Sequence, residues 1–252
     1  MWLGQYATGM IEGMEVVEGG TTEAAMDELD RTTKASPSLS APAGFYGTAA
    51  VTRKGKERTI AILHAARDLL AEEGYAGLSL RAVARRAGMR LANLQHYYAT
   101  REHLLDGLLH FIAYSYDEVY TRLWDGKATP AQRLTALVEY LLQDTRNPTT
   151  NRLFFEIWSL AQRNESAARL IDWMYGHHRG NLETLIASIS PDMPATVRSH
   201  RAALIAMQVE GLMILLAAAM PDHPELRGIE AECVRQIQRL TMWEEGRDSV
   251  PS

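Results

Sequence analysis

The stretch from Ser79 to Tyr98 holds the residue types and spacing that most clearly suggest a chemical role. Its second half is polar, contains no carboxylate, and exposes Arg90, Asn93, Gln95, His96 and Tyr97. Amide and guanidinium groups can read base edges in the major groove of DNA, while hydroxyls and cations hold phosphates. The pattern therefore favours a helix that contacts DNA.

The distribution of charge along the chain bears on this interpretation. The chain of 252 residues has a net charge of −5, which taken whole argues against nucleic acid as a partner. However, residues 53–101 hold ten basic and four acidic residues, residues 1–52 hold two and seven, and residues 102–252 hold 14 and 20. A compact basic segment between two acidic ones indicates either a nucleic-acid-binding module or a solvated basic face.

The elements that would position the polar residues are short amphipathic helices. Apolar residues spaced i, i+3, i+4 and i+7 predict a first helix from about Ile62, with Gly74 as a left-handed cap at its end. Ser79 is expected to cap a second helix, and Gly88 to form the turn into a third over 91–98. Leu94 and Tyr98 would pack that third helix onto the second, as in a helix-turn-helix.

The same residues resemble the tetracycline-repressor (TetR) type of bacterial transcriptional regulator. The resemblance covers about residues 56–116. It is carried by Ile62, Ala65-Ala66, Leu69-Leu70, Glu73-Gly74-Tyr75, Ser79, Val83-Ala84, Ala87-Gly88, Leu94, Tyr98, Thr100-Arg101-Glu102 and Leu104-Leu105.

This resemblance implies an all-α fold: an N-terminal three-helix helix-turn-helix domain, then a helical ligand-binding and dimerisation domain. It also implies a DNA-binding surface, in which Ser79 and Arg101 would meet phosphates and the residues from Asn93 to Tyr97 would lie on the recognition helix. The full expected set is Ser79, Arg81, Arg90, Asn93, Gln95, His96, Tyr97 and Arg101. Two departures from the family pattern, Arg90 for Ser or Thr and Gln95 for Tyr, predict an unusual operator preference.

The remainder of the chain predicts further helices that Pro and Gly separate. Thr129-Pro130 and Asn147-Pro148 are expected to open two of them, and the last is expected over about 225–243. Their aromatic and methionine residues are expected mainly in the core, but the resemblance implies an effector pocket among the middle helices. Its expected lining is Phe155, Trp158, Met174, Tyr175, Met207 and Glu210. Glu210 lies in an apolar stretch, so its carboxylate could meet a ligand, an arginine, the partner subunit or water.

Several other classes of function find little support in the residues. No phosphate-binding glycine loop, nucleophile elbow or metal-ligand spacing is present, and the pair His177-His178 points in two directions on a helix, so no enzyme, cofactor or metal is expected. The single Cys233 favours a reducing, cytoplasmic setting. Residues 204–220 are too short and too polar for a membrane span, and are expected at a subunit interface.

These observations predict a ligand-responsive repressor that binds a pseudo-palindromic DNA operator as a homodimer, with an unknown small-molecule effector. A helical small-molecule-binding protein, and an architectural DNA-binding dimer without a ligand, remain as alternatives. The expected organisation is an arm over 1–52, a DNA-binding domain over 53–101, an effector and dimerisation domain over 102–245 and a tail over 246–252. The arm is either a disordered extension or an over-extended start.

Overall fold

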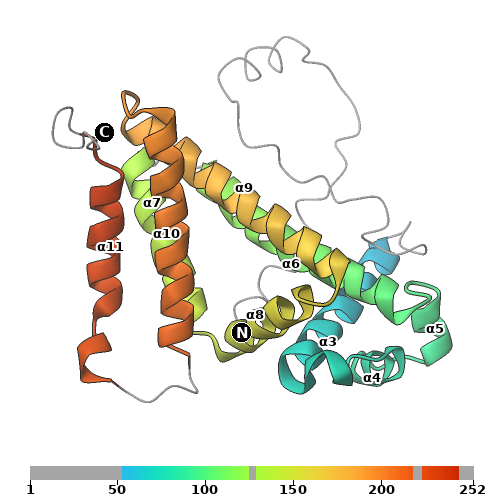
Figure 1. Cartoon of the computed structure of the whole chain (residues 1–252). Helices are drawn as coiled ribbons and strands as arrows, with labels where there is room; N and C mark the ends of the chain where they lie inside the picture. Colours follow the sequence, from blue (N-terminus) through green and yellow to red (C-terminus); the bar gives the residue numbers. More distant parts are fainter. Residues whose placement is uncertain (1–52, 125–128, 218–222, 244–252) are drawn as a thin grey trace, which may run out of the picture. The chain divides into compact units, whose positions relative to one another are not determined.

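The computed structural model describes residues 53–124, 129–217 and 223–243 (Figure 1). These residues form α-helices and one short 3-10 helix and contain no strand, which confirms the expected all-α class. The expected arm and tail lie outside the described residues. Two compact units are distinguished: unit 1 contains residues 53–69 and 76–118, and unit 2 contains residues 70–75 and the described residues after 118.

Unit 1 is built from most of α3 (Arg53–Gly77), the short helices α4 (Leu80–Arg86) and α5 (Leu91–Gln95), and most of α6 (Arg101–Trp124). Each helix turns an apolar face inward, as the spacing predicts. The fully buried side chains include Ile62, Leu63, Ala66, Leu69, Val83, Leu94, Tyr98, Leu104, Leu105 and Leu108. The recognition segment therefore stands on a small apolar core.

A close approach between α6 and Tyr98 fixes the end of this segment. A Cβ atom added at Gly107 would lie 2.6 Å from Tyr98 Cε1, closer than real carbon atoms come. Because Tyr98 is fully buried, its ring has no room to retreat. The absence of a side chain at Gly107 is what lets the Tyr98 ring lie against α6.

Gly74 departs from the expectation of a left-handed cap that ends the first helix. Its φ of 68° and ψ of −177° make a kink, and α3 continues to Gly77. The amide of Tyr75 donates to Glu156 Oε2 at 3.2 Å, within unit 2, so the kinked backbone finds its partner in a distant carboxylate. Glycine is suited to this position because φ is positive and because a Cβ would meet the same Glu156 oxygen at 3.1 Å.

Unit 2 contains α7 (Pro130–Thr145), α8 (Pro148–Ala161), α9 (Glu165–Ile189), α10 (Ala195–Leu215), the 3-10 helix η1 (Pro224–Leu226) and α11 (Ile229–Leu240). Polar side chains begin several of them as predicted. Thr129 and Gln132 form a reciprocal capping box at α7, and Asn147 caps α8. The last helix begins later than expected, because Gly228 with φ of 75° separates it from η1.

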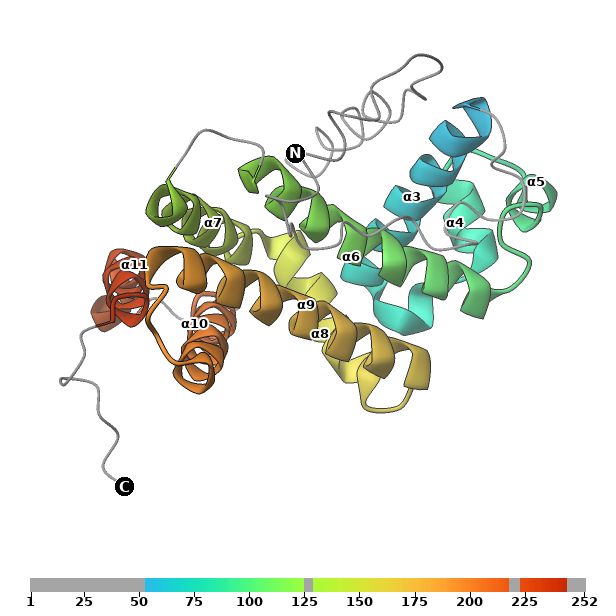
Figure 2. The same ribbon diagram turned by 90° about the horizontal axis from the view of Figure 1, so that it is seen from above.

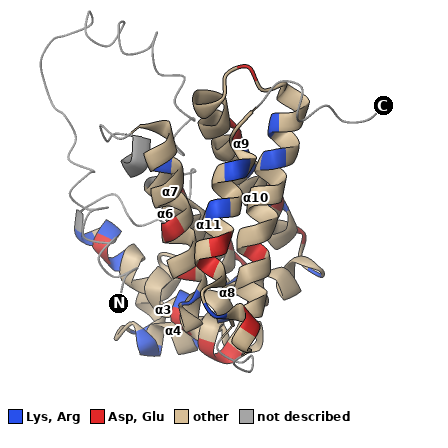
Figure 3. Ribbon diagram, turned by 90° about the vertical axis from the view of Figure 1, so that its left-hand side faces the viewer, with Lys and Arg blue, Asp and Glu red and all other residues tan. Residues whose placement is uncertain are grey.

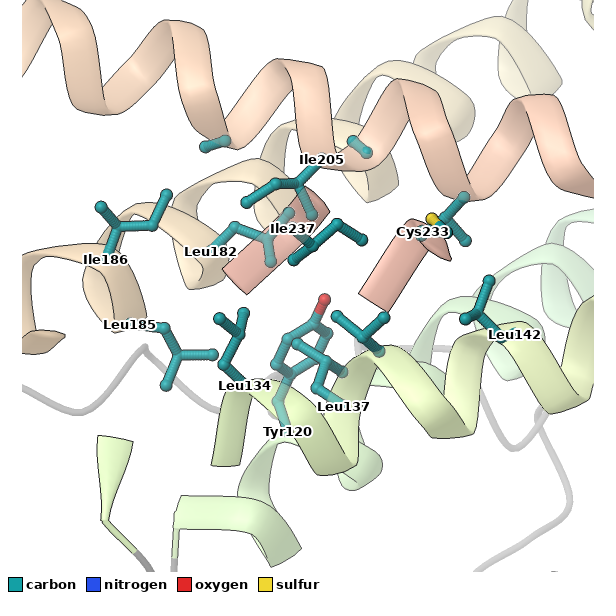
Figure 4. Close-up of a cluster of buried hydrophobic side chains, with 14 of the residues drawn as sticks. Tyr120, Leu134, Leu137, Leu142, Leu182, Leu185, Ile186, Ile205, Cys233 and Ile237 are labelled. Atoms are coloured by element: carbon teal, nitrogen blue, oxygen red, sulfur yellow. The ribbon is translucent and has the colours of Figure 1, made fainter. Parts of the chain in front are cut away.

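Helix α7 packs against α9, α10 and α11 in both views (Figures 1 and 2). Figure 4 shows the apolar side chains that meet between them, with Leu137, Leu182 and Ile205 fully buried and Ile237 nearly so. Burial of such side chains contributes about 1.5–3 kcal/mol each to folding. This core holds α9 and α10 in place, and with them the polar side chains that they carry.

Candidate DNA interface and buried polar cluster

The turn between α4 and α5 has the geometry of a helix-turn-helix. Ser79 Oγ accepts from the amide of Ala82 at 3.2 Å and begins α4, as predicted. Gly88 has a φ of 64°, and the next amide, that of Met89, returns a hydrogen bond of 2.9 Å to the carbonyl of Ala84. Ala84 is buried, so its small side chain permits the close passage of the two helices.

The predicted DNA-contacting residues are almost all turned to solvent. Ser79, Arg81, Arg90, Asn93, Gln95 and His96 are exposed, whereas Tyr97 and Arg101 are half-buried. Between Arg90 and Tyr98 the buried residues are Leu94 and Tyr98, the two that the sequence predicts to pack this segment. One face of α5 and the turn after it therefore offers amide, guanidinium and imidazole groups together.

Helix α5 begins at Arg90 without a side-chain cap. Since a Ser, Thr, Asp or Asn at this position would bond the first free amides, the short helix forgoes that stabilisation. The residue at this position instead places the exposed guanidinium of Arg90 at the first turn of the helix that is predicted to contact DNA. The helix is also shorter than expected and ends at Gln95, with a turn over His96 and Tyr97.

Other exposed cations of unit 1 are Lys54 and Arg58 of α3 and Arg85 and Arg86 of α4, in addition to Arg81. Figure 3 marks Lys and Arg along the ribbon in blue. The site residues predicted from sequence did not include Lys54 and Arg58. The signal that could have identified them was the net positive charge of residues 53–101, which these two residues help to produce.

A second polar arrangement lies inside unit 2 and joins three of the predicted pocket residues. Trp158 of α8 donates its indole N–H to the hydroxyl oxygen of Tyr175 of α9 at 2.9 Å. The Tyr175 hydroxyl in turn bonds the carboxyl group of Glu210 of α10. These residues are 17 and 35 positions apart in sequence, and the helix packing brings them into one chain of hydrogen bonds.

Glu210 is the charged member of this cluster. Burial is the main cause that raises its pKa from 4.5 to about 7, and the hydrogen bond from Tyr175 opposes that rise. Its second oxygen, Oε2, is shielded from solvent and has no hydrogen-bond partner among the described residues. Burial also raises the pKa of Tyr175, which keeps its hydroxyl protonated and able to donate.

The other predicted pocket residues lie at the margin. The Phe155 ring meets the Trp158 ring edge-on with centroids 5.6 Å apart, and its side chain is 39% exposed. Met174 is half-buried next to Tyr175, and Met207 is 65% exposed on α10. The structure thus groups Trp158, Tyr175 and Glu210, with Phe155 beside them, and leaves Met207 facing outward.

The histidine pair forms contacts that the sequence did not reveal. His178 Nδ1 bonds the hydroxyl of Tyr120, and burial lowers the pKa of His178 to about 4, which keeps the ring neutral near pH 7. The His177 ring stacks on Trp173 with centroids 5.2 Å apart. Across the part of the chain that the structure describes, no group of three or more His, Cys, Asp or Glu side chains is placed to hold a metal ion. Nor does any helix among those residues have the length and apolarity to cross a membrane.

Two family models match the chain. The model of bacterial regulatory proteins of the tetR family matches residues 62–108, and that of the C-terminal part of BetI-type transcriptional repressors matches residues 130–241. The first match spans the helix-turn-helix, and the second spans the helices that carry the buried polar cluster. Both descriptions, and the relatives below, are of transcriptional regulators, a class without enzymatic activity.

Individual proteins agree with these models. An uncharacterised HTH-type transcriptional regulator in the dhlA 5' region of Xanthobacter autotrophicus is 28% identical, over 67% of this chain and 84% of its own length. The HTH-type transcriptional regulator BetI of Rhizobium meliloti is 26% identical, over 62% and 76%. A solved regulator from Saccharomonospora viridis, in complex with choline, shares the fold at 19% identity, with a TM-score of 0.56 over 71% of this chain and 92% of that one.

The helix-turn-helix with its exposed polar face, the helical unit that follows it and the two matching models lead to one conclusion. The chain belongs to the tetR family of bacterial regulatory proteins and is a DNA-binding, repressor-like transcriptional regulator.

Proposed function

We propose that the protein is a cytoplasmic repressor that binds a pseudo-palindromic operator as a homodimer and leaves it when a small molecule binds in unit 2. The observation that carries the DNA-binding part is the surface of α5. Arg90, Asn93, Gln95 and His96 are exposed there, no carboxylate interrupts them, and a packed core supports them. Such side chains can bond base edges, with Arg and Gln suited to guanine and adenine respectively.

The dimer part of the proposal is supported by an apolar face on α10. Leu204, Met207, Ile214 and Leu215 are between 42% and 65% exposed and recur at helical spacing along one side. Ala203 and Gly211, which lie on the same side, are small enough to permit close approach of a second helix. Apolar side chains gathered in this way favour burial against a partner, and a second copy of the chain would supply an identical face.

The effector part is supported by the cluster of Trp158, Tyr175 and Glu210. Ligand sites are mainly apolar and contain a few placed polar groups, and this cluster combines aromatic rings with a buried carboxyl group that has bonding capacity to spare. It lies in the segment that matches BetI-type repressors. We infer that a small molecule completes the hydrogen bonding of this cluster.

A gel-shift experiment with DNA fragments from directly upstream of the protein's own gene tests the proposed function. We expect a specific shift at low salt that weakens steeply as salt rises, because bound cations release counterions from the phosphates. The absence of a shift on every promoter-proximal fragment at low salt would contradict the proposal.

Sedimentation of a charged interface variant tests the dimer separately. Replacing Leu204 and Met207 by Glu should convert dimer to monomer, because it places two carboxylates in the contact on each side. Ala136→Glu, at an exposed position of α7, adds the same kind of charge away from that face and should leave the dimer intact. An unchanged mass for the double variant would show that α10 does not form the interface.

A further inference from the structure

Arg90 begins α5, and its backbone and its side chain have different roles there. Its φ of −73° and ψ of 143° are extended, and its carbonyl accepts the amides of Asn93 at 3.0 Å and Leu94 at 3.2 Å. The backbone of Arg90 is therefore fixed to the helix, as that of an N-cap residue is. The side chain takes no part in the cap, because a guanidinium group has only donors and the free amides of the helix need acceptors.

Other polar side chains of unit 1 are used within the protein, and that of Arg90 is not. Ser79 Oγ accepts from the amide of Ala82 at the start of α4. Arg67 Nη2 of α3 lies 2.6 Å from Asp68 Oδ1, in a side chain that is 13% exposed. The Arg90 side chain is exposed and has no hydrogen-bond or ion-pair partner among the described residues. Stabilisation of the fold therefore does not account for a guanidinium group at this position.

The side chains around Arg90 are short or turned inward. Gly88 and Ala92, two positions before and after it, are exposed, whereas Met89 and Leu91 are half-buried. A Cβ atom added at Gly88 would have nothing within 4 Å, so no other side chain crowds the turn. A long side chain between two short ones protrudes beyond them. Arg90 would consequently be the first group of this turn to enter a DNA groove that the segment approaches.

The chemistry of the major groove favours guanine as the partner of this guanidinium group. Recognition helices of helix-turn-helix proteins contact base edges with their N-terminal residues, and Arg90 stands at that end of α5. Guanine presents two neighbouring acceptors, N7 and O6, which match the two donors of an arginine, whereas adenine sets a donor beside its N7. A phosphate group also accepts from arginine, but it does so equally at every DNA sequence.

We propose that Arg90 is a specificity-determining residue that reads one guanine in each half-site of the operator. Its guanidinium group donates two hydrogen bonds, one to N7 and one to O6 of that guanine. The half-sites that the protein prefers therefore contain a G·C pair at the position that faces the start of α5. This inference rests on the proposed function, since it requires α5 to contact an operator, and it goes further by assigning one base to one residue.

Selection from a pool of randomised DNA duplexes by the full chain tests the proposal first. We expect the unchanged protein to select half-sites with a constant G·C pair, and Arg90→Ser to select the same motif with any base pair at that position. Serine supplies the cap that α5 lacks, so the variant should keep the helix, and circular dichroism checks its folding. Arg85→Ser, at an exposed position of α4, is the matched control and should leave every base preference unchanged.

A second measurement removes an acceptor from the DNA in place of the donor from the protein. 7-Deazaguanine has a C–H group where guanine has N7, and it keeps O6 and its pairing with cytosine. At the selected position, it should weaken binding by the unchanged protein roughly tenfold or more, because one of the two hydrogen bonds is lost. Binding by Arg90→Ser should not change. Fluorescence anisotropy with the two duplexes measures the affinities of both proteins.

The proposal is overturned if Arg90→Ser keeps the preference for guanine. It is also overturned if this variant binds all duplexes more weakly by one common factor, which would make Arg90 a phosphate contact, or if 7-deazaguanine affects both proteins equally. In each of these cases the unchanged protein still selects a motif, so the proposed function stands and this inference alone is removed. If the unchanged protein selects no motif, the proposed function fails together with it.

Discussion

The two units place their polar side chains in opposite ways. In unit 1 the polar groups around α5 are exposed on an apolar core, whereas in unit 2 the half-buried Tyr175 bonds both Trp158 and Glu210, which are half-buried as well. The exposed groups can rearrange freely toward DNA and are screened by salt. The half-buried groups of unit 2 are held in place by their hydrogen bonds, so the loss of a hydrogen-bond partner costs more free energy there than at the surface. Exposed polar side chains suit contact with a long polyanion such as DNA. A fixed cluster of hydrogen-bonded side chains suits the selection of one small molecule.

The largest expected effect concerns the exposed side of this comparison. Replacing Asn93 and Gln95 together by Ala should weaken binding to the operator roughly 30-fold or more, because each specific contact to a base contributes about 1–3 kcal/mol. Binding to unrelated DNA should change little, since contacts to phosphates remain. Fluorescence anisotropy with the two kinds of duplex measures both effects. An unchanged affinity for the operator would show that α5 does not make the specific contacts to the bases.

Glycine substitutions compare the packing of the two units. Gly107→Ala should destabilise the protein by about 1–3 kcal/mol, because its Cβ would overlap the buried Tyr98 ring in unit 1. Gly180→Ala on α9 of unit 2 has nothing within 4 Å of the added atom and should stabilise by up to about 1 kcal/mol through helix propensity. Urea unfolding of both variants measures the difference. Equal free energies of unfolding for the two variants would mean that the core around Tyr98 can rearrange to accommodate the added methyl group.

The polar cluster of unit 2 predicts an effect of pH on stability. Because burial raises the pKa of Glu210 to about 7, its contribution to stability is full below pH 4.5 and is lost as the pH rises through about 7. Tyr175 of α9 is the titratable group that faces this carboxyl, and it stays protonated over the range. Relative to the unchanged protein, Glu210→Gln should gain about 2 kcal/mol between pH 5.5 and pH 8. Thermal unfolding at the two pH values, with Glu139→Gln as the exposed control, measures it; a parallel shift of both variants would show that Glu210 is solvated.

A substitution at Arg90 has the smallest expected effect on stability. Arg90→Ser would supply the cap that α5 lacks and should stabilise the protein by about 0.5–1 kcal/mol. The same change removes an exposed guanidinium and should weaken operator binding. A higher free energy of unfolding together with a weaker affinity for the operator would support the view that Arg90 favours DNA binding at the expense of stability. A loss in both would mean that Arg90 holds the turn together.

Much of the fold could be predicted from residue spacing and from capping residues. Ser79, Thr129 and Asn147 begin the helices that they were expected to begin, because their side chains bond amides only two or three residues away. Gly74 has the expected positive φ and interrupts the helix, but its ψ of −177° is not that of a left-handed cap, and the next amide bonds Glu156, which is far away in sequence. Residue spacing and capping residues predict hydrogen bonds between neighbours in sequence. They do not predict backbone geometry that involves a distant side chain.

The same distinction holds for the two candidate sites. The exposed residues of α5 could be named from sequence because a helix with one apolar face must turn the other to water. Glu210 could be singled out as a charge in an apolar stretch, but its partners Trp158 and Tyr175 depend on how α8, α9 and α10 pack. The pairing of Tyr120 with His178 was missed for the same reason.

Helix α5 and the turn that precedes it are proposed to read a specific DNA sequence. The most direct measurement compares, by fluorescence anisotropy at physiological salt, the affinity for the operator found upstream of the protein's own gene with that for a shuffled duplex of equal length and composition. We expect the protein to bind the operator roughly a thousandfold more tightly than the shuffled duplex, or better. Equal affinity for the two duplexes would contradict it.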